Sequence, residues 1–227
     1  MAVVIIGNGK SRENIDLEKI KKHAKVYGCN ALYRDFSPDY LYTGDPHITH
    51  EVLSGDYALN NTVVLNNMES IPAMAREGLT FEGKVVENEP TGFEFFCTGW
   101  GDYTYITWIK EGSKIMKTPW VDDGVGLSAG LMATRFAHHQ FSTDVIYLIG
   151  FDIFGKRDNI YDGTNGYPSE DYPNEMEKEF IEGFEYLINT YERIKIKRVI
   201  EQWTSLKNIP NVSEDELWQV LEDNRKI

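Results

Sequence analysis

The chain opens with AVVII at residues 2–6, followed directly by GNGKS at residues 7–11, and this junction decides the expected fold. An apolar, mostly β-branched run is typical of a strand buried on both faces of a parallel sheet. Glycines at the end of such a strand let the backbone turn sharply and approach a ligand closely. A helix after the turn would favour an anion, because its N-terminus carries free N–H groups and a partial positive charge. The junction predicts a nucleotide site built from Gly7, Asn8, Gly9, Lys10 and Ser11.

The glycine turn matches neither standard phosphate-binding motif. It lacks the third glycine of the dinucleotide fingerprint, and Lys10 and Ser11 lack the upstream glycine spacing of a phosphate-cradling loop. A strand–turn–helix without a ligand is therefore the alternative. Lys10 and Arg12 carry charges that could neutralise a phosphate, although solvent-exposed positions suit them equally.

Composition excludes several classes of partner. The 227 residues include 36 acidic and 23 basic side chains, for a formal net charge of -13, which disfavours nucleic acid and anionic membrane surfaces. The N-terminal apolar run is too short for a membrane span and has no basic region before it, so neither a span nor a signal peptide is predicted. Two cysteines indicate no disulfide framework, which fits a cytoplasmic location.

Strand and helix patterns alternate along most of the chain. Further strands are expected at residues 25–30, 39–46, 61–66 and 144–152, and helices at 16–24, 124–141 and 174–191. The alternation predicts one α/β domain over residues 1–227, with a Rossmann-like, doubly wound, mostly parallel sheet. Residues 195–200 alternate in charge and predict the edge strand at which the sheet ends. A capping box at Ser213 predicts a final helix.

Two segments interrupt this rhythm. Residues 78–120 contain two alternating stretches, 93–97 and 103–109, which predict an inserted β-hairpin flap after a short helix at 68–76. Residues 154–173 are rich in Gly, Asp, Asn, Pro and Tyr, and their length predicts a lid-like loop.

Ligands of doubly wound sheets bind outside the carboxyl ends of the strands. The strand ends here are Gly7 to Ser11, Cys29-Asn30, Gly44-Asp45-Pro46 and Gly150-Phe151-Asp152, and a helix begins near Ser128-Ala129-Gly130. In this order they resemble the bacterial sialyltransferase fold and its relatives, which include the archaeal hydroxymethylpterin pyrophosphokinase-like proteins. The resemblance covers roughly the first fifty residues and residues 124 to 152.

The resemblance implies a nucleotide-sugar-dependent glycosyltransferase that takes a cytidine-monophosphate sugar and needs no cofactor. It implies a saccharide or small-molecule acceptor, and self-association into a homo-oligomer is left open. The donor would be held by the glycine turn and by Asn30, Ser128, Gly130 and Asp152. We predict that Tyr161 and Tyr167 of the lid-like loop stabilise the leaving phosphate.

One part of the family pattern is missing. The family places its general base on a histidine after the Gly-x-Asp strand, whereas every histidine here precedes it. Asp45 and His47 are the predicted replacements. A metal cluster of Asp45, His47 and His50 is a weaker alternative, because no helix fixes their spacing.

Two other functions fit the same residues. A magnesium-dependent diphosphotransferase would use Asp45 and Asp152 as metal ligands. A noncatalytic nucleotide-binding protein would keep the site without turnover. Asp152 could also simply cap the neighbouring backbone, as carboxylates at strand ends often do.

Overall fold

A computed structural model describes residues 2–65, 80–81, 84–85, 94–100, 103–120, 127–141, 145–155, 158–169, 171, 177–191, 193–201 and 206–223. The chain divides into two compact units: Met1–Tyr42 with Gly124–Ile227, and Thr43–Asp123. The predicted flap at 78–120 falls within the second unit, and the helix expected at 68–76 lies outside the described residues.

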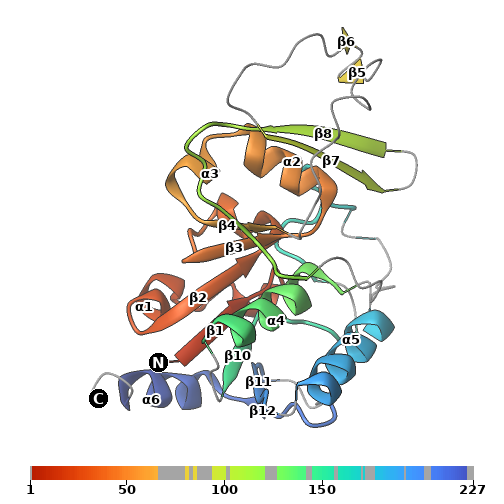
Figure 1. The fold of residues 1–227 in the computed structure, drawn as a ribbon. Helices are drawn as coiled ribbons and strands as arrows, with labels where there is room; N and C mark the ends of the chain where they lie inside the picture. Colours follow the sequence, from red (N-terminus) through yellow and green to blue (C-terminus); the bar gives the residue numbers. More distant parts are fainter. Residues whose placement is uncertain are drawn as a thin grey trace. The chain divides into compact units, whose positions relative to one another are not determined.

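The first unit is built on a parallel sheet with the strand order β12-β11-β10-β1-β2-β3 (Figure 1). β1 is buried along its whole length, as its apolar sequence predicts. The strands are β1 (Ala2–Ile6), β2 (Ala24–Cys29), β3 (Tyr40–Thr43), β10 (Ile146–Ile149), β11 (Ile196–Val199) and β12 (Asn211–Val212).

The prediction that the sheet ends at residues 195–200 is wrong, because β12 pairs with β11 on its outer side. Two of the three charged residues in this segment do not end in solvent. Lys197 forms an ion pair with Glu216 at 2.9 Å, and Arg198 is fully buried. Charges at these positions therefore do not by themselves indicate an edge strand, because they can bind partners within the protein.

Helices cover both faces of this sheet. Tyr27 of β2 donates a hydrogen bond to Gln140 of α4 at 2.5 Å, so α4 lies on the face of Tyr27. Lys197 points to the opposite face, toward Glu216 of α6. α5 packs on α4, and Lys19 of α1 lies over a ring of α6. The helices are α1 (Leu17–Lys21), α4 (Ala129–Phe141), α5 (Glu177–Thr190) and α6 (Glu214–Asp223).

This arrangement is a Rossmann-like, doubly wound α/β fold, as the sequence predicts. Two 3-10 turns follow the carboxyl ends of β1 and β2, namely η1 (Lys10–Arg12) and η2 (Asn30–Arg34). From β1 the chain winds outward through β2 and β3, and it later returns to β10 on the other side of β1. The carboxyl ends of β1 and β10 are thus the switch point, where such folds bind their ligands.

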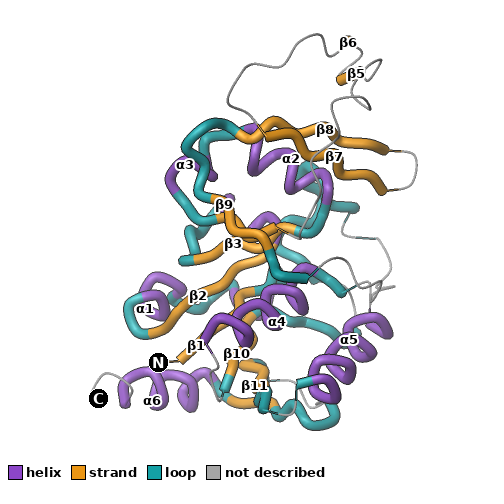
Figure 2. Tube along the Cα trace, in the orientation of Figure 1, coloured by secondary structure: helices purple, strands orange, loops and turns teal. Residues whose placement is uncertain are grey.

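The second unit combines one parallel strand pair with two antiparallel pairs. The predicted hairpin is confirmed: β7 and β8 pair from Glu94–Ile109 to Trp100–Tyr103, and they run side by side in Figure 2. The elements of the second unit are α2 (Pro46–Ser54), α3 (Tyr57–Asn60), β4 (Val63–Leu65), β5 (Thr80–Phe81), β6 (Lys84–Val85), β7 (Glu94–Trp100), β8 (Tyr103–Ile109) and β9 (Ile115–Lys117).

Candidate functional site

Backbone hydrogen bonds join the ends of β1 and β10. The N–H of Gly7 donates to the carbonyl of Ile149 at 2.8 Å, and the N–H of Gly9 donates to the carbonyl of Gly150 at 2.9 Å. A Cβ on Gly7 would lie 2.5 Å from the Gly150 oxygen, and Gly150 itself has φ +71°. Both positions require glycine, one for space and the other for its backbone conformation.

The Asp152 carboxylate is bound to the glycine turn. Its Oδ2 accepts from the N–H of Ser11 at 2.8 Å, and its Oδ1 accepts from the Ser11 hydroxyl. A Cβ on Gly9 would lie 2.5 Å from Asp152 Cγ, so the glycine makes room for the carboxylate. Asp152 thus takes hydrogen bonds that an anionic ligand of the turn would otherwise take, and its geometry fits the capping role.

Arg198 binds the backbone just after β10 and interacts with the Asp152 carboxylate. Its side chain is 0% exposed, with NH1 3.4 Å from the Phe151 carbonyl and Nε 3.0 Å from Asn211 Oδ1. Burial lowers the pKa of the Arg198 guanidinium, and attraction to the Asp152 carboxylate opposes that shift. The buried positive charge therefore helps to hold the carboxylate at the turn.

Residues 158–169, the covering segment, are hydrogen-bonded along the glycine turn. The N–H of Lys10 donates to the carbonyl of Asp158 at 3.1 Å, and the N–H of Ile160 donates to the carbonyl of Asn8 at 2.8 Å. The covering segment belongs to the predicted lid-like loop at 154–173. The Asp158 carbonyl thus accepts from the Lys10 N–H, a donor of the turn that the sequence predicts to face a phosphate.

The two tyrosines predicted to stabilise a leaving phosphate are both in the covering segment. Tyr167 accepts a hydrogen bond from Asn8 Nδ2 at 3.0 Å, and its ring centroid lies 5.8 Å from that of Tyr161. Asn8 Oδ1 is buried and has no hydrogen-bond partner among the described residues. The structure thus brings the side chains of Asn8 and Tyr167 together. Among the described residues it gives no donor to the amide oxygen of Asn8.

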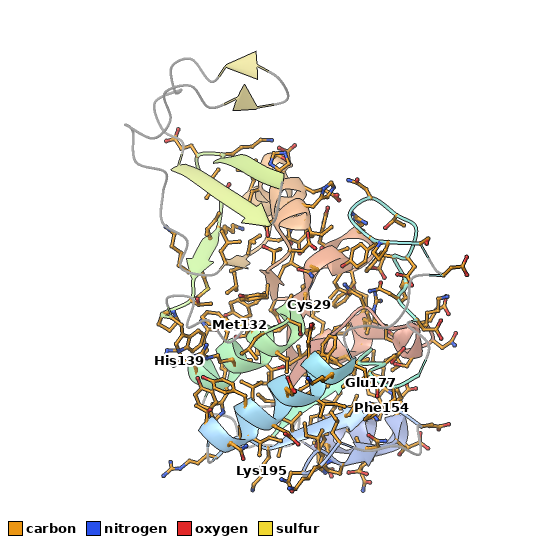
Figure 3. The ribbon with its side chains drawn as sticks, turned by 90° about the vertical axis from the view of Figure 1, so that its right-hand side faces the viewer. Cys29, Met132, His139, Phe154, Glu177 and Lys195 are labelled. Atoms are coloured by element: carbon orange, nitrogen blue, oxygen red, sulfur yellow. The ribbon has the colours of Figure 1, made fainter. Side chains whose placement is uncertain are left out.

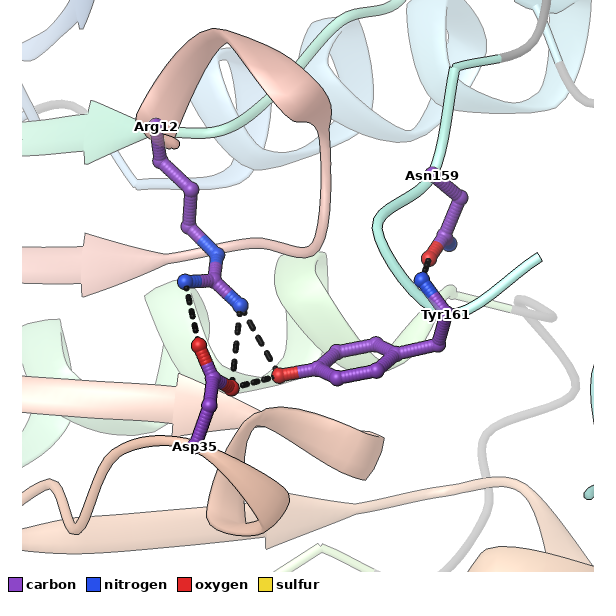
Figure 4. A network of polar contacts seen from close by, with 4 residues as sticks. All are labelled: Arg12, Asp35, Asn159 and Tyr161. Atoms are coloured by element: carbon purple, nitrogen blue, oxygen red, sulfur yellow. Dashed lines mark hydrogen bonds and ion pairs between the residues drawn. The ribbon is translucent and has the colours of Figure 1, made fainter. Parts of the chain in front are cut away.

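Tyr161 forms a polar network with Arg12 and Asp35 (Figure 4). Arg12 NH2 donates to the Tyr161 hydroxyl at 2.8 Å, and that hydroxyl donates to Asp35 Oδ1. Arg12 NH1 forms an ion pair with Asp35 Oδ2 at 3.0 Å. Burial, helped by the hydrogen bond to Asp35, raises the pKa of Tyr161. The shift extends to alkaline pH the range over which the hydroxyl is protonated and donates its hydrogen bond to Asp35.

Arg34 makes a second connection to the covering segment. Its NH1 donates to Thr164 Oγ1 and its NH2 to the Asn165 carbonyl, both at 2.8 Å. The guanidinium carbon lies 5.9 Å from the Tyr161 ring centroid. Arg34 and Asp35 are not among the site residues predicted from the sequence. They follow Asn30 by one short turn, so extending the strand-end rule past the end of β2 would have found them.

The N-terminus of α4 meets the glycine turn at the Phe151 ring. An added Cβ on Gly130 would lie 2.7 Å from one atom of that ring, and one on Gly7 would lie 3.2 Å from another. The Ser128 carbonyl accepts the first helical bond, from Met132 at 2.9 Å. A serine at this position normally caps the helix with its hydroxyl. Here Oγ is buried and has no partner within the described ranges.

Asn30 lies directly after β2 in the left-handed backbone region, with φ +49°. Asparagine is one of the few residue types that adopt this conformation readily. The preceding Cys29 donates its thiol to the Ile6 carbonyl at 3.4 Å, and burial raises the pKa of that thiol to about 12. A Cβ added to Gly130 of α4 would lie 3.9 Å from the Cys29 sulfur, and Figure 3 labels Cys29. The end of β2 is thus fixed among β1 and α4.

The two predicted proton acceptors belong to the second unit. Asp45 is the N-cap of α2: its Oδ1 accepts from the N–H of Ile48 at 3.1 Å, and its carbonyl accepts from Thr49 Oγ1 at 2.7 Å. His47 is half-buried within the first turn of that helix. Asp45 therefore has a structural task whether or not it takes part in chemistry.

The first unit brings together most of the residues predicted to bind a donor. Contacts at the strand ends connect Gly7, Asn8, Gly9, Lys10, Ser11, Gly130, Asp152, Tyr161 and Tyr167, and Ser128 begins the adjoining helix. Within the described part of the chain, no three His, Cys, Asp or Glu side chains are grouped so that they could hold a metal ion.

Comparisons with known proteins add no family. No family model matches the chain, and no curated protein matches it. Of the helices that the structure describes, none combines the length and apolar character needed to cross a membrane.

Proposed function

We propose that the chain is a nucleotide-sugar-dependent glycosyltransferase whose donor binds at the switch point of the first unit. One observation carries the proposal: Asn8 Oδ1 and Ser128 Oγ are both buried without a partner among the described residues. They belong to two segments that meet at the Phe151 ring. Buried polar atoms are nearly always hydrogen-bonded. We therefore expect a bound ligand to supply the partners of Asn8 Oδ1 and Ser128 Oγ.

The chemistry of these atoms suits a sugar nucleotide. An amide oxygen accepts hydrogen bonds from hydroxyl groups, and a serine hydroxyl both donates and accepts. The positive end of the thirteen-residue helix α4 begins beside Ser128 and favours a phosphate there. Hydroxyl groups and a phosphate together are the polar groups of a nucleotide-linked sugar.

Transfer would proceed by direct displacement at the anomeric carbon. The bond from that carbon to the phosphate oxygen breaks as a bond to the acceptor oxygen forms, and the nucleotide leaves with the electron pair. The acceptor proton must pass to a base, and Asp45 and His47 remain the residues that the sequence predicts for that role. Tyr167 supplies a hydroxyl to the departing phosphate in this proposal.

The first test is thermal unfolding of the intact chain with cytidine, uridine, guanosine and adenosine nucleotides, each with and without magnesium. A ligand at a hundred times its dissociation constant stabilises by about 2.7 kcal/mol, which raises Tm by roughly 5 to 10 °C. A pyrimidine nucleotide that acts without magnesium supports the transferase. A shift only with a purine triphosphate and magnesium supports the diphosphotransferase, and no shift with any nucleotide overturns both.

Ser128→Ala connects the shift to the site. The substitution removes a hydroxyl without a described partner, so Tm without ligand should stay within about 1 °C while nucleotide affinity falls about tenfold. Thr134→Val is the matched control, because Thr134 Oγ1 bonds to the Gly130 carbonyl at 2.8 Å within α4. That variant should keep the ligand-induced shift. Binding without turnover of any sugar nucleotide would leave a noncatalytic binding protein.

A further inference from the structure

The covering segment presents oxygen atoms to cationic and N–H donors of the first unit. Lys10 donates its backbone N–H at 3.1 Å, Arg12 its NH2 at 2.8 Å, and Arg34 both terminal nitrogens at 2.8 Å. The acceptors are the Asp158 carbonyl, the Tyr161 hydroxyl, the Thr164 hydroxyl and the Asn165 carbonyl.

These donors are the kind that proteins use to bind phosphate. Guanidinium groups and backbone N–H groups at a glycine turn both recognise phosphate oxygens, and arginine does so with paired donors. A phosphate group offers acceptor oxygens alone at neutral pH. The oxygens of the covering segment therefore occupy the places that phosphate oxygens would occupy on the same donors.

We propose that Arg12 and Arg34 form an anion site for the phosphate of the ligand, and that residues 158–165 of the covering segment occupy this site until the ligand displaces them. The inference deepens the proposed function and rests on it for the assignment of the phosphate to a nucleotide. The covering segment is then a competitor of the ligand, and the affinity measured for the ligand is reduced by the fraction of molecules in which the segment is closed.

The contacts of Arg12 show how the exchange would occur. Its side chain is 3% exposed, and Tyr161 is the neighbour whose hydroxyl binds NH2. Asp35, whose side chain is 46% exposed, accepts from NH1 at 3.0 Å and also from NH2 at 3.3 Å. These two bonds to Asp35 fix the guanidinium while NH2 exchanges the tyrosine hydroxyl for a phosphate oxygen. Arg12 Nε has no partner among the described residues and is a further donor.

The test uses inorganic pyrophosphate as the probe, which carries phosphate chemistry without a base or a sugar. Its binding to the intact chain is measured by isothermal titration calorimetry, and amide hydrogen exchange is followed at Lys10 and Ile160. Displacement of the covering segment should deprotect Ile160, because that amide donates across to Asn8. Lys10 should stay protected, because its N–H would exchange the Asp158 carbonyl for a phosphate oxygen.

Substitutions on the two sides should change pyrophosphate affinity in opposite directions. Tyr161→Phe removes the segment's hydroxyl from Arg12 and should tighten binding about fivefold, and Thr164→Val, which takes a hydroxyl from Arg34, should do the same. Arg34→Ala removes a donor of the site and should weaken binding about tenfold. Tyr191→Phe is the matched control, since Tyr191 accepts from Arg135 Nε at 2.7 Å elsewhere in the unit. It should leave the affinity unchanged.

The proposal is overturned if pyrophosphate binds neither the wild type nor Tyr161→Phe and Thr164→Val. It is also overturned if substitutions on both sides weaken binding, or if Ile160 stays protected in the complex. These results are separable from those on the transferase. Pyrophosphate binding with the expected signs, together with no response to any nucleotide, would retain the anion site and remove the nucleotide-sugar function.

Discussion

A single carboxylate organises the glycine turn. Asp152 binds both the backbone and the hydroxyl of Ser11, and Gly9 has no side chain where that carboxylate lies. Glycine at the end of a buried strand is commonly interpreted as space for a ligand. At Gly9 the space is filled by the protein's own acid, so the residue pattern alone does not distinguish an external anion from an internal one.

Gly9→Ala should destabilise the fold by about 1 to 3 kcal/mol through overpacking. The new Cβ would lie 2.5 Å from Asp152 Cγ and 2.8 Å from the Gly150 carbonyl, which must both move. Urea unfolding gives the free energy directly. Gly55→Ala is the control, because its nearest atom would be 3.2 Å away, at the Glu51 carbonyl, and its φ is -78°. Equal losses in the two variants would show that the carboxylate does not depend on Gly9.

At the scale of single elements, strong local patterns predicted the structure well. The apolar runs of β1 and β10 became buried strands, and the alternating stretches of the flap became β7 and β8. Ser213 caps α6, accepting from the Glu216 N–H at 3.2 Å. In each case the information lies within about ten neighbouring residues, which is the range over which hydrophobic periodicity and capping act.

Features that depend on distant residues were not predictable in this way. β12 has only two residues, Asn211 and Val212, which are too few to show any period. The contacts of Arg34 with Thr164 and Asn165 join segments that only the completed sheet brings together. A charged side chain has the same local appearance whether it ends in solvent or binds a loop, so the sequence does not identify its partner.

The α2 cap allows structure and chemistry at Asp45 to be separated. Asp45→Ala should cost about 1 kcal/mol of stability, because the Ile48 N–H loses its acceptor. Asp45→Asn keeps a capping oxygen and should unfold close to the wild type. If Asp45 is the base, both variants lose turnover to a similar extent. An asparagine variant with full activity would restrict this residue to capping, as paired urea melts and transferase assays would show.

For the molecule as a whole, buried acidic groups predict a loss of stability at alkaline pH. Burial raises the pKa of Cys29 from 9.0 to about 12, and it also raises the pKa of Tyr27 and Tyr161 from 10.0. The unfolded chain releases these protons first. Their contribution to stability is therefore complete below the unfolded values and is lost as pH rises toward the folded ones.

Between pH 9 and 10, Cys29 should dominate this loss. The free energy of unfolding should fall toward a limit of about 1.4 kcal/mol per pH unit for each such group. Urea unfolding of reduced protein at half-unit steps measures the slope. Cys29→Ala should flatten the curve in this interval and leave the later decline, due to the tyrosines, in place. An unchanged slope would mean that the thiol ionises in the native state.

The position of β1 also has a consequence for synthesis on the ribosome. Val3 pairs with Lys25 on one side and with Ile146 on the other. The first partner emerges shortly after β1, whereas the second emerges only when most of the chain has been translated. Until then the most apolar strand of the nascent chain has an open edge, which can pair with another chain. Early protection of that edge, by a chaperone or by slow release, would determine how much of the newly made protein reaches its native state.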